Sequence, residues 1–394
     1  MEKREHTNLK QKKERKEMKK LSVFLIALMA SLAIGISTAR GQLGYSLTDL
    51  GVVENMDSSS AAALNNQGHV AGTAYKGQET CAFHYDYLKN VMEDAGGVNS
   101  RGFGINSLNM VVGDAFFAHP GGPKVAISPS HAAVFQNGVV QDLGVLAGQM
   151  YSRANGINAM GQVVGYSGPN RDSNNSRAFS WSSQTGMIDI GTLGGAYAQA
   201  YAINDAGLIT GTAQTSAAIG TTHAFLYCPQ CAGPAQKRDL GVLGGNSSYG
   251  MAINNNNHVA GYSTIKTSTP NDGRVHAFLH DGTKMIDLGS LGGYGSQWGS
   301  DTSVALGLNN LDQVVGYSYL PATGGMPIQQ VAFLWRSGQM INLNTLLLGD
   351  GKNYLVFSAA AINDFGQIAA SAYDMRTGNA RAVLLTPAGP PPPP

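Results

Sequence analysis

The sequence has few charged residues and few cysteines. Asp, Glu, Lys and Arg make up 13% of its 394 residues, and only three residues are cysteine. Much of the positive charge lies near the start: without residues 1–39, the chain keeps 17 basic and 21 acidic residues, a net charge of −4. A chain without a basic excess has no electrostatic footprint for nucleic acid, so we do not expect a nucleic-acid partner.

Short catalytic motifs are also missing. The sequence contains no Gly-x-Ser-x-Gly elbow, no His-Glu-x-x-His and no Gly-x-x-x-x-Gly-Lys phosphate loop. The oxygen-rich stretches 170–175 and 271–273 do not match an EF-hand loop, so calcium is an alternative that no specific motif supports. We therefore predict no cofactor and no metal site. Catalytic carboxylates brought together from separate parts of the chain would leave no such motif.

The N-terminus predicts export. A basic run ends at Met18-Lys19-Lys20, an apolar run follows to Ile36, and Ser37-Thr38-Ala39 offers small residues for signal peptidase. We predict a signal peptide over residues 1–39, with Met18 as an alternative start, and a location outside the cell, on its surface or in the periplasm. A retained membrane anchor is the alternative, but the apolar run is short for a bilayer span. After cleavage we expect no stable membrane span.

The cysteines form one close pair and one single residue. Cys228 and Cys231 stand in a CxxC, which is typical of a redox pair, half a zinc site or a local disulfide. Zinc would need two more ligands, and there is no second CxxC. In an exported protein we favour a disulfide that pins a loop. Cys81 then remains free.

A five-residue row dominates the sequence and recurs seven times, with 46 to 55 residues between copies. Its second residue is always alanine, and its third and fifth are mostly aromatic or aliphatic. A period near 50 with strand-like content is typical of a propeller or a solenoid. The copies begin at Cys81, His131, Arg177, His223, His276, Val331 and Arg381.

A second row, Ile-Asn or Leu-Asn, also recurs seven times, and in most copies glycine follows the asparagine three residues later. This pattern between apolar runs predicts a hairpin, because asparagine bonds to nearby backbone and glycine adopts a positive φ. The asparagines are Asn65, Asn106, Asn158, Asn204, Asn254, Asn309 and Asn363.

Each repeat thus divides into four short strands, here called a, b, c and d. We predict an all-β fold: a seven-bladed β-propeller of four-stranded antiparallel blades over residues 40–387. The first strand, near residues 45–51, lacks its own a, b and c, and the last repeat lacks d, so we expect these to pair and close the ring. An open β-solenoid is the alternative. Residues 388–394 form a proline-rich tail, and we expect a monomer.

The rows Asp-Leu-Gly-x-Leu-Gly-Gly, Ala-x-x-Ile-Asn and His-Ala-Phe-Leu resemble the bacterial "probable extracellular repeat, HAF family". The His-Ala-Phe triplet is intact at His223 and His276, and the resemblance covers about residues 45–385. It implies an extracellular or cell-surface location. It implies no chemistry, because the family supplies no catalytic residues to carry over.

Long, variable connections between strands b and c make one face of the predicted propeller the expected binding face. Repeated His131, His223 and His276, and the repeated aspartates of the Asp-Leu-Gly rows, are expected to be structural, with the carboxylates bonding backbone amides of the next turn. Residues on the long-loop face that would suit a sugar or another ligand are Tyr151, Tyr197, Tyr249, Tyr294, Trp298, Asp172 and Asp272.

Three functions remain open. The first is a non-catalytic scaffold that binds a glycan or a protein through the long-loop face. The second is a polysaccharide lyase or hydrolase built on carboxylates that do not repeat, and the third is a structural envelope protein. The carboxylates to examine are Asp114, Asp172, Asp272 and Asp301.

Overall fold

The computed structural model describes residues 44–117, 130–170, 175–216, 221–233, 236–266, 274–292, 301–321 and 328–389. The predicted signal peptide, residues 1–39, and most of the proline-rich tail lie outside the described residues. The chain divides into two units, Met1–Gly44 and Tyr45–Pro394, and the description below concerns the second.

The described residues form antiparallel groups of four strands, which we number I to VII. Group I holds β2 (Ser58–Leu64), β3 (Val70–Lys76), β4 (Glu79–Asp86) and β5 (Val91–Val98); group II holds β6 (Ser100–Ile105), β7 (Val111–Phe116), β8 (Ser130–Gln136) and β9 (Val139–Asp142); group III holds β10 (Tyr151–Ile157), β11 (Val163–Gly168), β12 (Arg177–Ser182) and β13 (Gly186–Asp189).

Group IV holds β14 (Ala198–Ile203), β15 (Ile209–Gln214), β16 (Thr222–Tyr227) and β17 (Lys237–Asp239); group V holds β18 (Gly244–Ile253), β19 (Val259–Ile265), β20 (Val275–His280) and β21 (Met285–Asp287); group VI holds β22 (Ser303–Leu308), β23 (Val314–Leu320), β24 (Gln329–Arg336) and β25 (Gln339–Asn342); group VII holds β26 (Tyr354–Ile362), β27 (Ile368–Asp374), β28 (Ala380–Pro387) and β1 (Tyr45–Asp49). Two short 3-10 helices, η2 (Leu343–Leu346) and η3 (Gly349–Asn353), connect groups VI and VII.

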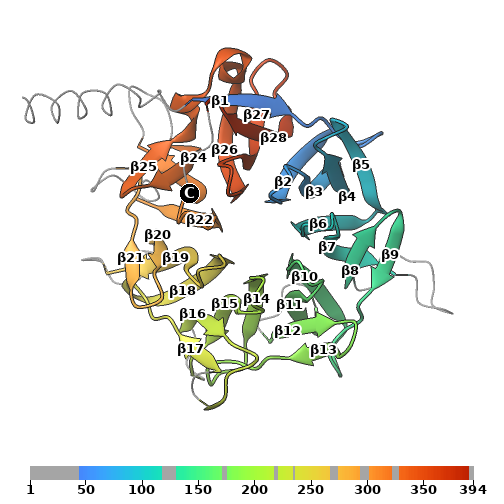
Figure 1. The fold of residues 1–394 in the computed structure, drawn as a ribbon, viewed down its shortest axis with the longest axis vertical. Coiled ribbons are helices and arrows are strands. Elements are labelled where there is room, and N and C mark those ends of the chain that lie inside the picture. The colour runs from blue at the N-terminus through green and yellow to red at the C-terminus, as the bar shows by residue number, and fades with distance from the viewer. Residues whose placement is uncertain are drawn as a thin grey trace, which may run out of the picture. The chain divides into compact units, whose positions relative to one another are not determined.

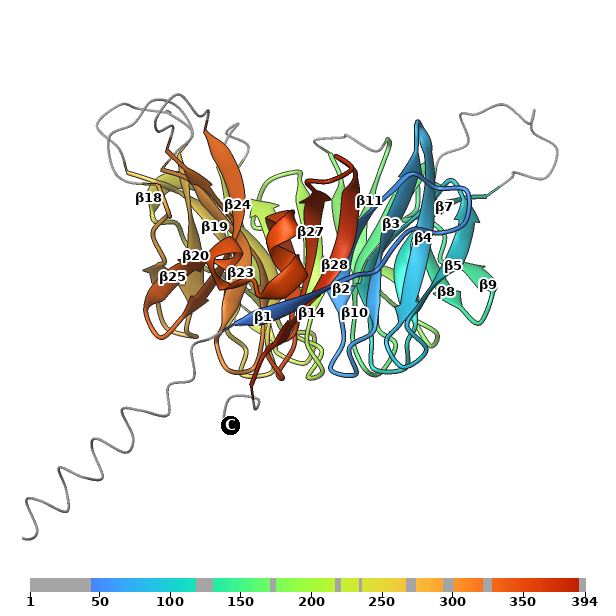
Figure 2. The ribbon, with the colours of Figure 1, turned by 90° about the horizontal axis from the view of Figure 1, so that it is seen from above.

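The groups stand around a common axis, with β2, β6, β10, β14, β22 and β26 innermost and β5, β9, β13, β21, β25 and β1 outermost (Figure 1). A view from the side shows the strands of each group running between two opposite edges of the molecule (Figure 2). Groups IV and V are joined into one eight-stranded sheet by a single parallel pair between β16 and β18, Thr222 with Ser247. The predicted all-β architecture of four-stranded antiparallel sheets is confirmed.

The strand nearest the start of the sequence belongs to the group nearest its end. β1 pairs antiparallel with β28, in a register from Tyr45 opposite Pro387 to Asp49 opposite Val383. The expected pairing between these two strands is therefore present, and it supplies group VII with its fourth strand.

The first strand of every group bulges at the same place. In group III the register shifts between Ala154 and Gly156, which leaves Asn155 unpaired at the bulge. The glycine opposite is required by contact, because a Cβ on Gly165 would lie 1.9 Å from the carbonyl oxygen of Arg153. This accounts for the glycine of the repeated Val-Val-Gly run. The bulged residues are Ala62, Phe103, Asn155, Tyr201, Met251, Leu306 and Ala360.

Small residues follow each bulge because neighbouring groups approach closely there. A Cβ on Gly156 would meet the carbonyl oxygen of Tyr201 in the next group at 3.1 Å, and one on Gly307 would meet Ala361 at 2.8 Å. The innermost strands are therefore crowded at this level.

The Ala-Phe pair of the repeated row packs the groups against each other. Consecutive residues of a strand point to opposite faces, so Ala and Phe face different neighbours. Phe179 of group III packs with Ala132 of group II, and Phe225 of group IV packs with Ala178 of group III. All four side chains are fully buried. A large ring therefore fills the space that the preceding group's alanine leaves.

A serine also fastens each of several groups to the next. Ser152 Oγ accepts from the amide of Ala132 at 2.8 Å and donates to the carbonyl of Gly144 at 2.5 Å. The Gly144 amide in turn donates to Asp142 Oδ1 at 2.7 Å. The Ala132 amide and the Gly144 carbonyl both precede group III in the sequence. Ser152 of group III therefore satisfies buried backbone atoms of group II and of the connection that follows it. Equivalent serines are Ser59, Ser100, Ser248 and Ser303.

The described part of the chain has no helix long and apolar enough to cross a membrane.

Candidate functional site

Seven asparagines surround the axis and are linked to one another. The side-chain amide of Asn204 donates to the carbonyl of Asn254 at 3.0 Å, and Asn254 donates to the carbonyl of Asn309 at 3.0 Å. The series returns to its start, because Asn363 donates to the carbonyl of Asn65 at 3.2 Å. We call this set the asparagine ring; the other links run from Asn65 to Asn106, Asn106 to Asn158, Asn158 to Asn204 and Asn309 to Asn363.

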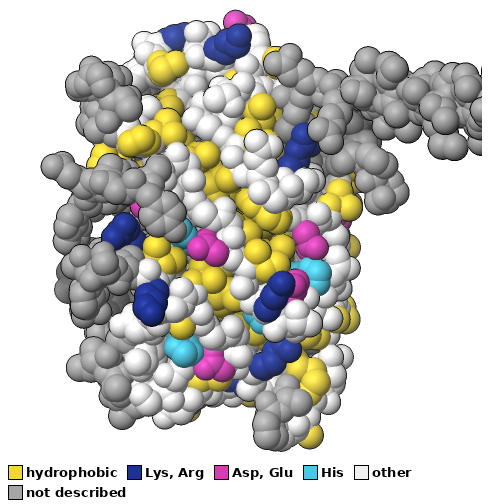
Figure 3. Space-filling model, turned by 90° about the vertical axis from the view of Figure 1, so that its left-hand side faces the viewer, with side chains coloured by type: hydrophobic (Ala, Val, Ile, Leu, Met, Phe, Trp, Pro, Cys, Tyr) yellow, Lys and Arg dark blue, Asp and Glu magenta, His cyan; other side chains and the backbone are white. Residues whose placement is uncertain are grey.

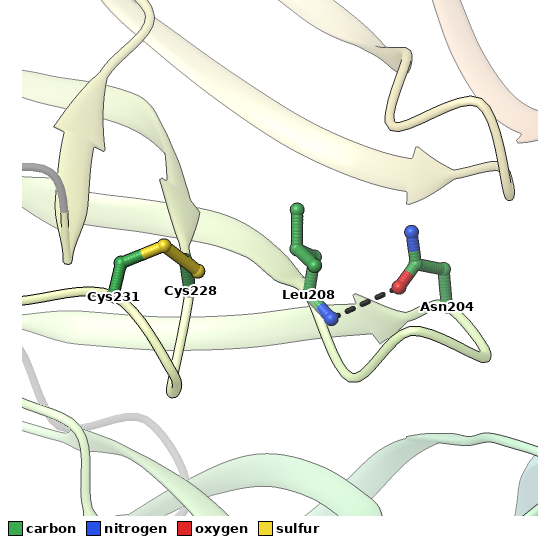
Figure 4. The surroundings of a disulfide bond; sticks show 4 residues. All are labelled: Asn204, Leu208, Cys228 and Cys231. Atoms are coloured by element: carbon green, nitrogen blue, oxygen red, sulfur yellow. Dashed lines mark hydrogen bonds between the residues drawn. A yellow bond between two sulfur atoms is a disulfide. The ribbon is translucent and has the colours of Figure 1, made fainter.

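The same side chains hold the hairpins between strands a and b. Asn204 Oδ1 accepts from the amide of Leu208 at 2.9 Å, as Figure 4 shows. Gly207 has a φ of 78°, the left-handed conformation that the Asn-x-x-Gly spacing predicts. Each asparagine thus stabilises its own turn with its oxygen and the next group with its nitrogen.

The disulfide lies on the same group as this turn. Cys228 and Cys231 are joined, with an S–S distance of 2.04 Å, in the connection between β16 and β17 (Figure 4). Cys81 is free and buried. Burial and a hydrogen bond to Asp94 raise the pKa of its thiol to about 12, so it is not a reactive nucleophile.

A cavity of about 490 Å³ lies along the axis. All seven bulged residues line it, together with Arg153 and the Ile or Leu that precedes each ring asparagine in most groups. These aliphatic side chains form a collar, beyond which a cavity of about 220 Å³ is lined by the asparagine ring, Asp205 and Asp364. Because strand a runs from its connection with strand d toward the ring, the larger cavity lies toward the edge where strands b and c connect.

The two cavities differ in charge. No Asp or Glu is among the described residues that line the larger cavity, and its charged side chain is Arg153. The smaller cavity carries carboxylates and neutral amides. An anionic ligand would therefore be favoured at the larger cavity and disfavoured at the smaller one.

Beside the larger cavity, Asp114 neutralises a different arginine. Asp114 is 1% exposed; its carboxylate accepts from Arg101 Nε at 2.9 Å and from the Tyr151 hydroxyl at 3.0 Å. A second bond joins Arg101 Nη2 to the other carboxylate oxygen. The fork is the bidentate geometry that arginine favours with carboxylates. Asp114, one of the unrepeated acids, is thus committed to an internal ion pair.

Arg153 has a different environment. Its guanidinium carbon lies 3.5 Å from the centroid of the Phe103 ring, and its buried Nε has no hydrogen-bond partner. The neighbouring bulged residues add polar atoms: Asn155 Nδ2 donates to the Ala200 carbonyl at 2.8 Å, and the Tyr201 hydroxyl donates to Gln199 Oε1 at 2.7 Å. Arginine, amide and phenol therefore meet on one side of the cavity.

Tyrosines gather near these residues. Tyr249 and Tyr262 stack, with centroids 4.6 Å apart. Burial, followed by the nearby Tyr249, raises the pKa of Tyr197 to about 12. Burial likewise raises the pKa of Tyr201 well above its ordinary value, and Tyr197 adds to this. These two hydroxyls stay protonated at neutral pH, and that of Tyr201 donates to Gln199.

The residues predicted for ligand binding fall into three classes. Tyr197 and Tyr249 are half-buried in the tyrosine group just described. Tyr151 is 3% exposed and bonded to Asp114, so its ring packs in the interior and offers no face to a sugar. This corrects the expectation for Tyr151. Outside the described residues lie Tyr294, Trp298, Asp172 and Asp272.

The repeated histidines and aspartates pair on the outer side of the groups. His131 Nδ1 lies 3.0 Å from Asp142 Oδ2, and His223 Nδ1 lies 2.8 Å from Asp239 Oδ2. The aspartates also accept the amide two residues on, as expected; Gly241 donates to Asp239 at 2.7 Å. Figure 3 shows histidines beside acidic side chains at several points of one outer side. The predicted bonding of the repeated aspartates to backbone amides of the next turn is confirmed.

His276 differs from the other histidines because it contacts two carboxylates. Its Nδ1 lies 2.9 Å from Asp287 and its Nε2 3.1 Å from Asp301. Asp301 also accepts from the Ser290 hydroxyl at 2.7 Å. Neither His276 nor Asp301 lines the axial cavities. Within the described ranges, no group of three or more His, Cys, Asp or Glu is placed to hold a metal ion.

Sequence reasoning missed the residues that line the larger cavity. Phe103, Asn155 and Tyr201 occupy one repeat position that is not conserved between repeats, two residues before the repeated Ile. Variation at a position otherwise surrounded by small residues was the signal that could have identified them. Arg153 could not be identified in this way, because the equivalent positions of the other repeats also hold many different residues.

Comparisons with known proteins address the fold. A family described as "Protein of unknown function (DUF3466)" matches residues 149–291. No curated protein matches the chain. The β-propeller domain of the trilobed protease from Pyrococcus furiosus, described as having an open velcro topology, aligns with a TM-score of 0.52 and 8% identity over 84% of this chain and 93% of that one. The fold is a β-propeller.

Two further structures show weaker similarity. An acylaminoacyl peptidase from Pyrococcus horikoshii has a TM-score of 0.47 and 10% identity, over 83% of this chain and 52% of that one. TolB from Acinetobacter baumannii has a TM-score of 0.41 and 9% identity, over 82% of this chain and 64% of that one. At these identities no activity is carried over to this chain.

Proposed function

We propose that this protein is an exported, non-catalytic β-propeller of seven blades, with β1 closing the last blade, and that it binds a surface glycan. The binding site is the mouth of the larger axial cavity, on the side where strands b and c connect. The asparagine ring and the β1–β28 pairing support seven blades and closure. Export rests on the predicted signal peptide, and membership of the HAF family rests on the repeated rows.

One observation carries the binding function. The cavity of about 490 Å³ collects one bulged side chain from each of the seven groups. Cavities of this size are typical of small-molecule sites. In every repeat the residue after the bulge is Ala or Gly and the next is Ile or Leu, whereas the bulged residues themselves range from alanine to phenylalanine, asparagine and tyrosine. A constant scaffold with a varied lining is the arrangement expected of a binding site.

The absence of acids along the described lining favours binding over hydrolysis. A glycosidase uses two carboxylates that flank the scissile bond. Asp114 is held in an ion pair and Asp301 is bonded to His276, and neither lines the cavity. The described lining of the larger cavity therefore supplies no such pair.

The test is a single assay on the exported full chain. A panel of bacterial and plant polysaccharides is scored by affinity electrophoresis for retention and by size-exclusion chromatography for shortening, with and without chelator. We expect retention of at least one polysaccharide without shortening. Shortening would replace the binding function with a polysaccharide-degrading one, and loss of the effect in chelator would assign it to a metal. No retention at all would contradict the glycan and favour a protein partner or a structural envelope role.

Export has its own test. N-terminal sequencing of the protein recovered outside the cytoplasm is expected to begin at Arg40. An intact apolar segment in that sample would show a retained anchor instead.

A further inference from the structure

The larger axial cavity contains a cation, Arg153, that no acid among the described residues neutralises. Arg101 and Arg153 lie on adjacent groups, but Arg101 forms a bidentate pair with Asp114, whereas Arg153 forms no ion pair among the described residues. Arg153 Nε is buried without a hydrogen-bond partner. A buried donor left unsatisfied is costly. The donors of Arg153 that a ligand in the cavity can reach are Nη1 and Nη2, which are not among the buried atoms that lack a partner.

The guanidinium is already oriented. The Phe103 ring covers one of its faces at 3.5 Å, which is the geometry of a cation–π contact. Stacking occupies the face of the plane and leaves the edge formed by Nη1 and Nη2 available, whereas Nε is buried. A planar anion approaching that edge can accept two parallel hydrogen bonds, as carboxylates do from arginine. The contact with Phe103 therefore fixes the orientation of the Arg153 guanidinium without using its hydrogen-bond donors.

The neighbouring side chains fit the remainder of a sugar. Asn155 is the bulged residue of group III, which also holds Arg153, and Tyr201 is the bulged residue of group IV. Both line the larger cavity. The Asn155 amide oxygen and the Tyr201 hydroxyl oxygen are acceptors for sugar hydroxyls. Met251 and Leu306, from the following groups, offer apolar surface to the C–H face of a ring. One anionic site, hydroxyl acceptors and an apolar wall coexist in one cavity.

We propose that this cavity recognises a uronic acid unit of a polysaccharide, with its carboxylate on the edge of Arg153. The proposal deepens the glycan-binding function proposed above and rests on it. The smaller cavity at the asparagine ring carries Asp205 and Asp364, so the anionic group is repelled from that end. Charge along the axis thus orients the sugar acid toward Arg153.

The experiment compares matched ligands and matched variants. Trigalacturonate and the same trisaccharide with its carboxyl groups reduced to alcohols are titrated into the exported full chain by calorimetry. The variants are Arg153→Met, Arg153→Lys and, as a control that removes one surface charge, Arg238→Met. Circular dichroism and thermal melting confirm that each variant is folded.

We expect the acid to bind at least tenfold more tightly than its reduced counterpart. Arg153→Met should lower the affinity for the acid at least tenfold and leave the weak binding of the reduced sugar unchanged. Arg153→Lys should recover part of the loss, since it restores the charge and not the fork, and Arg238→Met should bind as the unaltered protein does.

Three outcomes would overturn the proposal. Equal binding of acid and reduced sugar, insensitive to Arg153→Met, would reject the uronate while the glycan-binding function stands. Tighter binding of a sulfated trisaccharide than of trigalacturonate would replace the carboxylate with a sulfate. Retention of no polysaccharide in the panel would reject both proposals together.

Discussion

The side-chain amide of Asn363 donates to the backbone carbonyl of Asn65 at 3.2 Å, although the two residues lie 298 positions apart. The link between Asn65 and Asn106, which are neighbours in the repeat, has the same donor and acceptor and a length of 3.0 Å. The bond that joins the last group to the first is therefore of the same kind as the bonds between successive groups. Each ring asparagine therefore donates one such bond from its side chain and accepts one at its backbone carbonyl.

Replacing a ring asparagine by alanine should destabilise the protein. Asn254 is buried; its Nδ2 donates to Asn309 O at 3.0 Å and to Asp312 Oδ1 at 2.9 Å, and its Oδ1 accepts from the amides of Asn256 and His258 at 3.0 Å each. Asn254→Ala leaves these partners without bonds, and we expect a loss of about 3 kcal/mol in the free energy of unfolding.

Asn256→Ala, in the same turn but exposed, is the control and should cost less than about 1 kcal/mol. Both values come from urea denaturation followed by circular dichroism. Equal losses for the two variants would show that the ring contributes no more than any surface asparagine.

Adding a methyl group opposite a bulge should be poorly tolerated. A Cβ on Gly165 would lie 1.9 Å from the Arg153 carbonyl oxygen, so Gly165→Ala forces the two strands apart. We expect a loss of about 3 kcal/mol or more in the free energy of unfolding, as for severe overpacking. Gly389→Ala, where a Cβ would meet nothing within 4 Å, serves as the control and should be neutral. A melting temperature unchanged in both would contradict the contact.

The two carboxylates around His276 should make stability depend on pH. Burial lowers the pKa of His276, but the hydrogen bonds and charges of Asp287 and Asp301 outweigh it and raise the pKa above 6.5. A histidine with a raised pKa in the folded state stabilises below its unfolded pKa, and this stability is lost as pH rises through the folded pKa. We therefore expect the contribution of the cluster to be fully present at acidic pH and to fall as the pH rises above about 6.5.

Asp301→Asn removes one of the carboxylates and should flatten this dependence. The measured quantity is the free energy of unfolding at several pH values below and above about 6.5. The difference between the unaltered protein and the variant is expected to be larger at the acidic end. A difference that stays constant across the measured pH range would mean that Asp301 does not shift the pKa of His276.

Reducing the disulfide should have only a modest effect. Cys228 and Cys231 are three positions apart, and a bond that closes so short a loop contributes at most about 2 kcal/mol in the chain-entropy account. A thiol reductant should therefore lower the melting temperature by a few degrees and leave the fold intact. Complete unfolding would show that the loop between β16 and β17 is needed for the whole fold.

Alkylation after reduction gives an internal check. The pKa of Cys81 is raised to about 12 by burial, so its thiolate is scarce at neutral pH. Iodoacetamide should modify Cys228 and Cys231 in the folded, reduced protein, and Cys81 only after denaturation. Mass spectrometry distinguishes the two products.

The sequence predicted what each repeat does by itself. The hairpin could be predicted from the spacing of Asn204 and Gly207 alone, because the side-chain oxygen of Asn204 bonds an amide of its own turn. The pairing of β1 with β28 followed from counting strands at the two ends. The Cys228–Cys231 disulfide followed from spacing and expected compartment.

The sequence did not predict the hydrogen bonds and ion pairs that join residues far apart in the chain. The nitrogen of Asn204 bonds a carbonyl 50 positions away, and no local pattern names that acceptor. Likewise, His276 looks like the other repeated histidines until Asp301 is placed 3.1 Å from its second nitrogen. The bulge that turns Asn155 into the cavity is also invisible, because it depends on the partner strand's register.

The pairing of β1 with β28 has a consequence for the order in which the protein folds. Ser46 bonds Thr386, a contact that spans 340 positions, so the first strand made must wait for the last. Contacts of such long range form slowly and leave a strand edge exposed until they do. While the chain is still being made, the edge of β1 is free to pair with other chains. We infer that a shortened chain lacking β28 leaves the edge of β1 unpaired and therefore aggregates, whereas a chain that includes β28 stays monomeric.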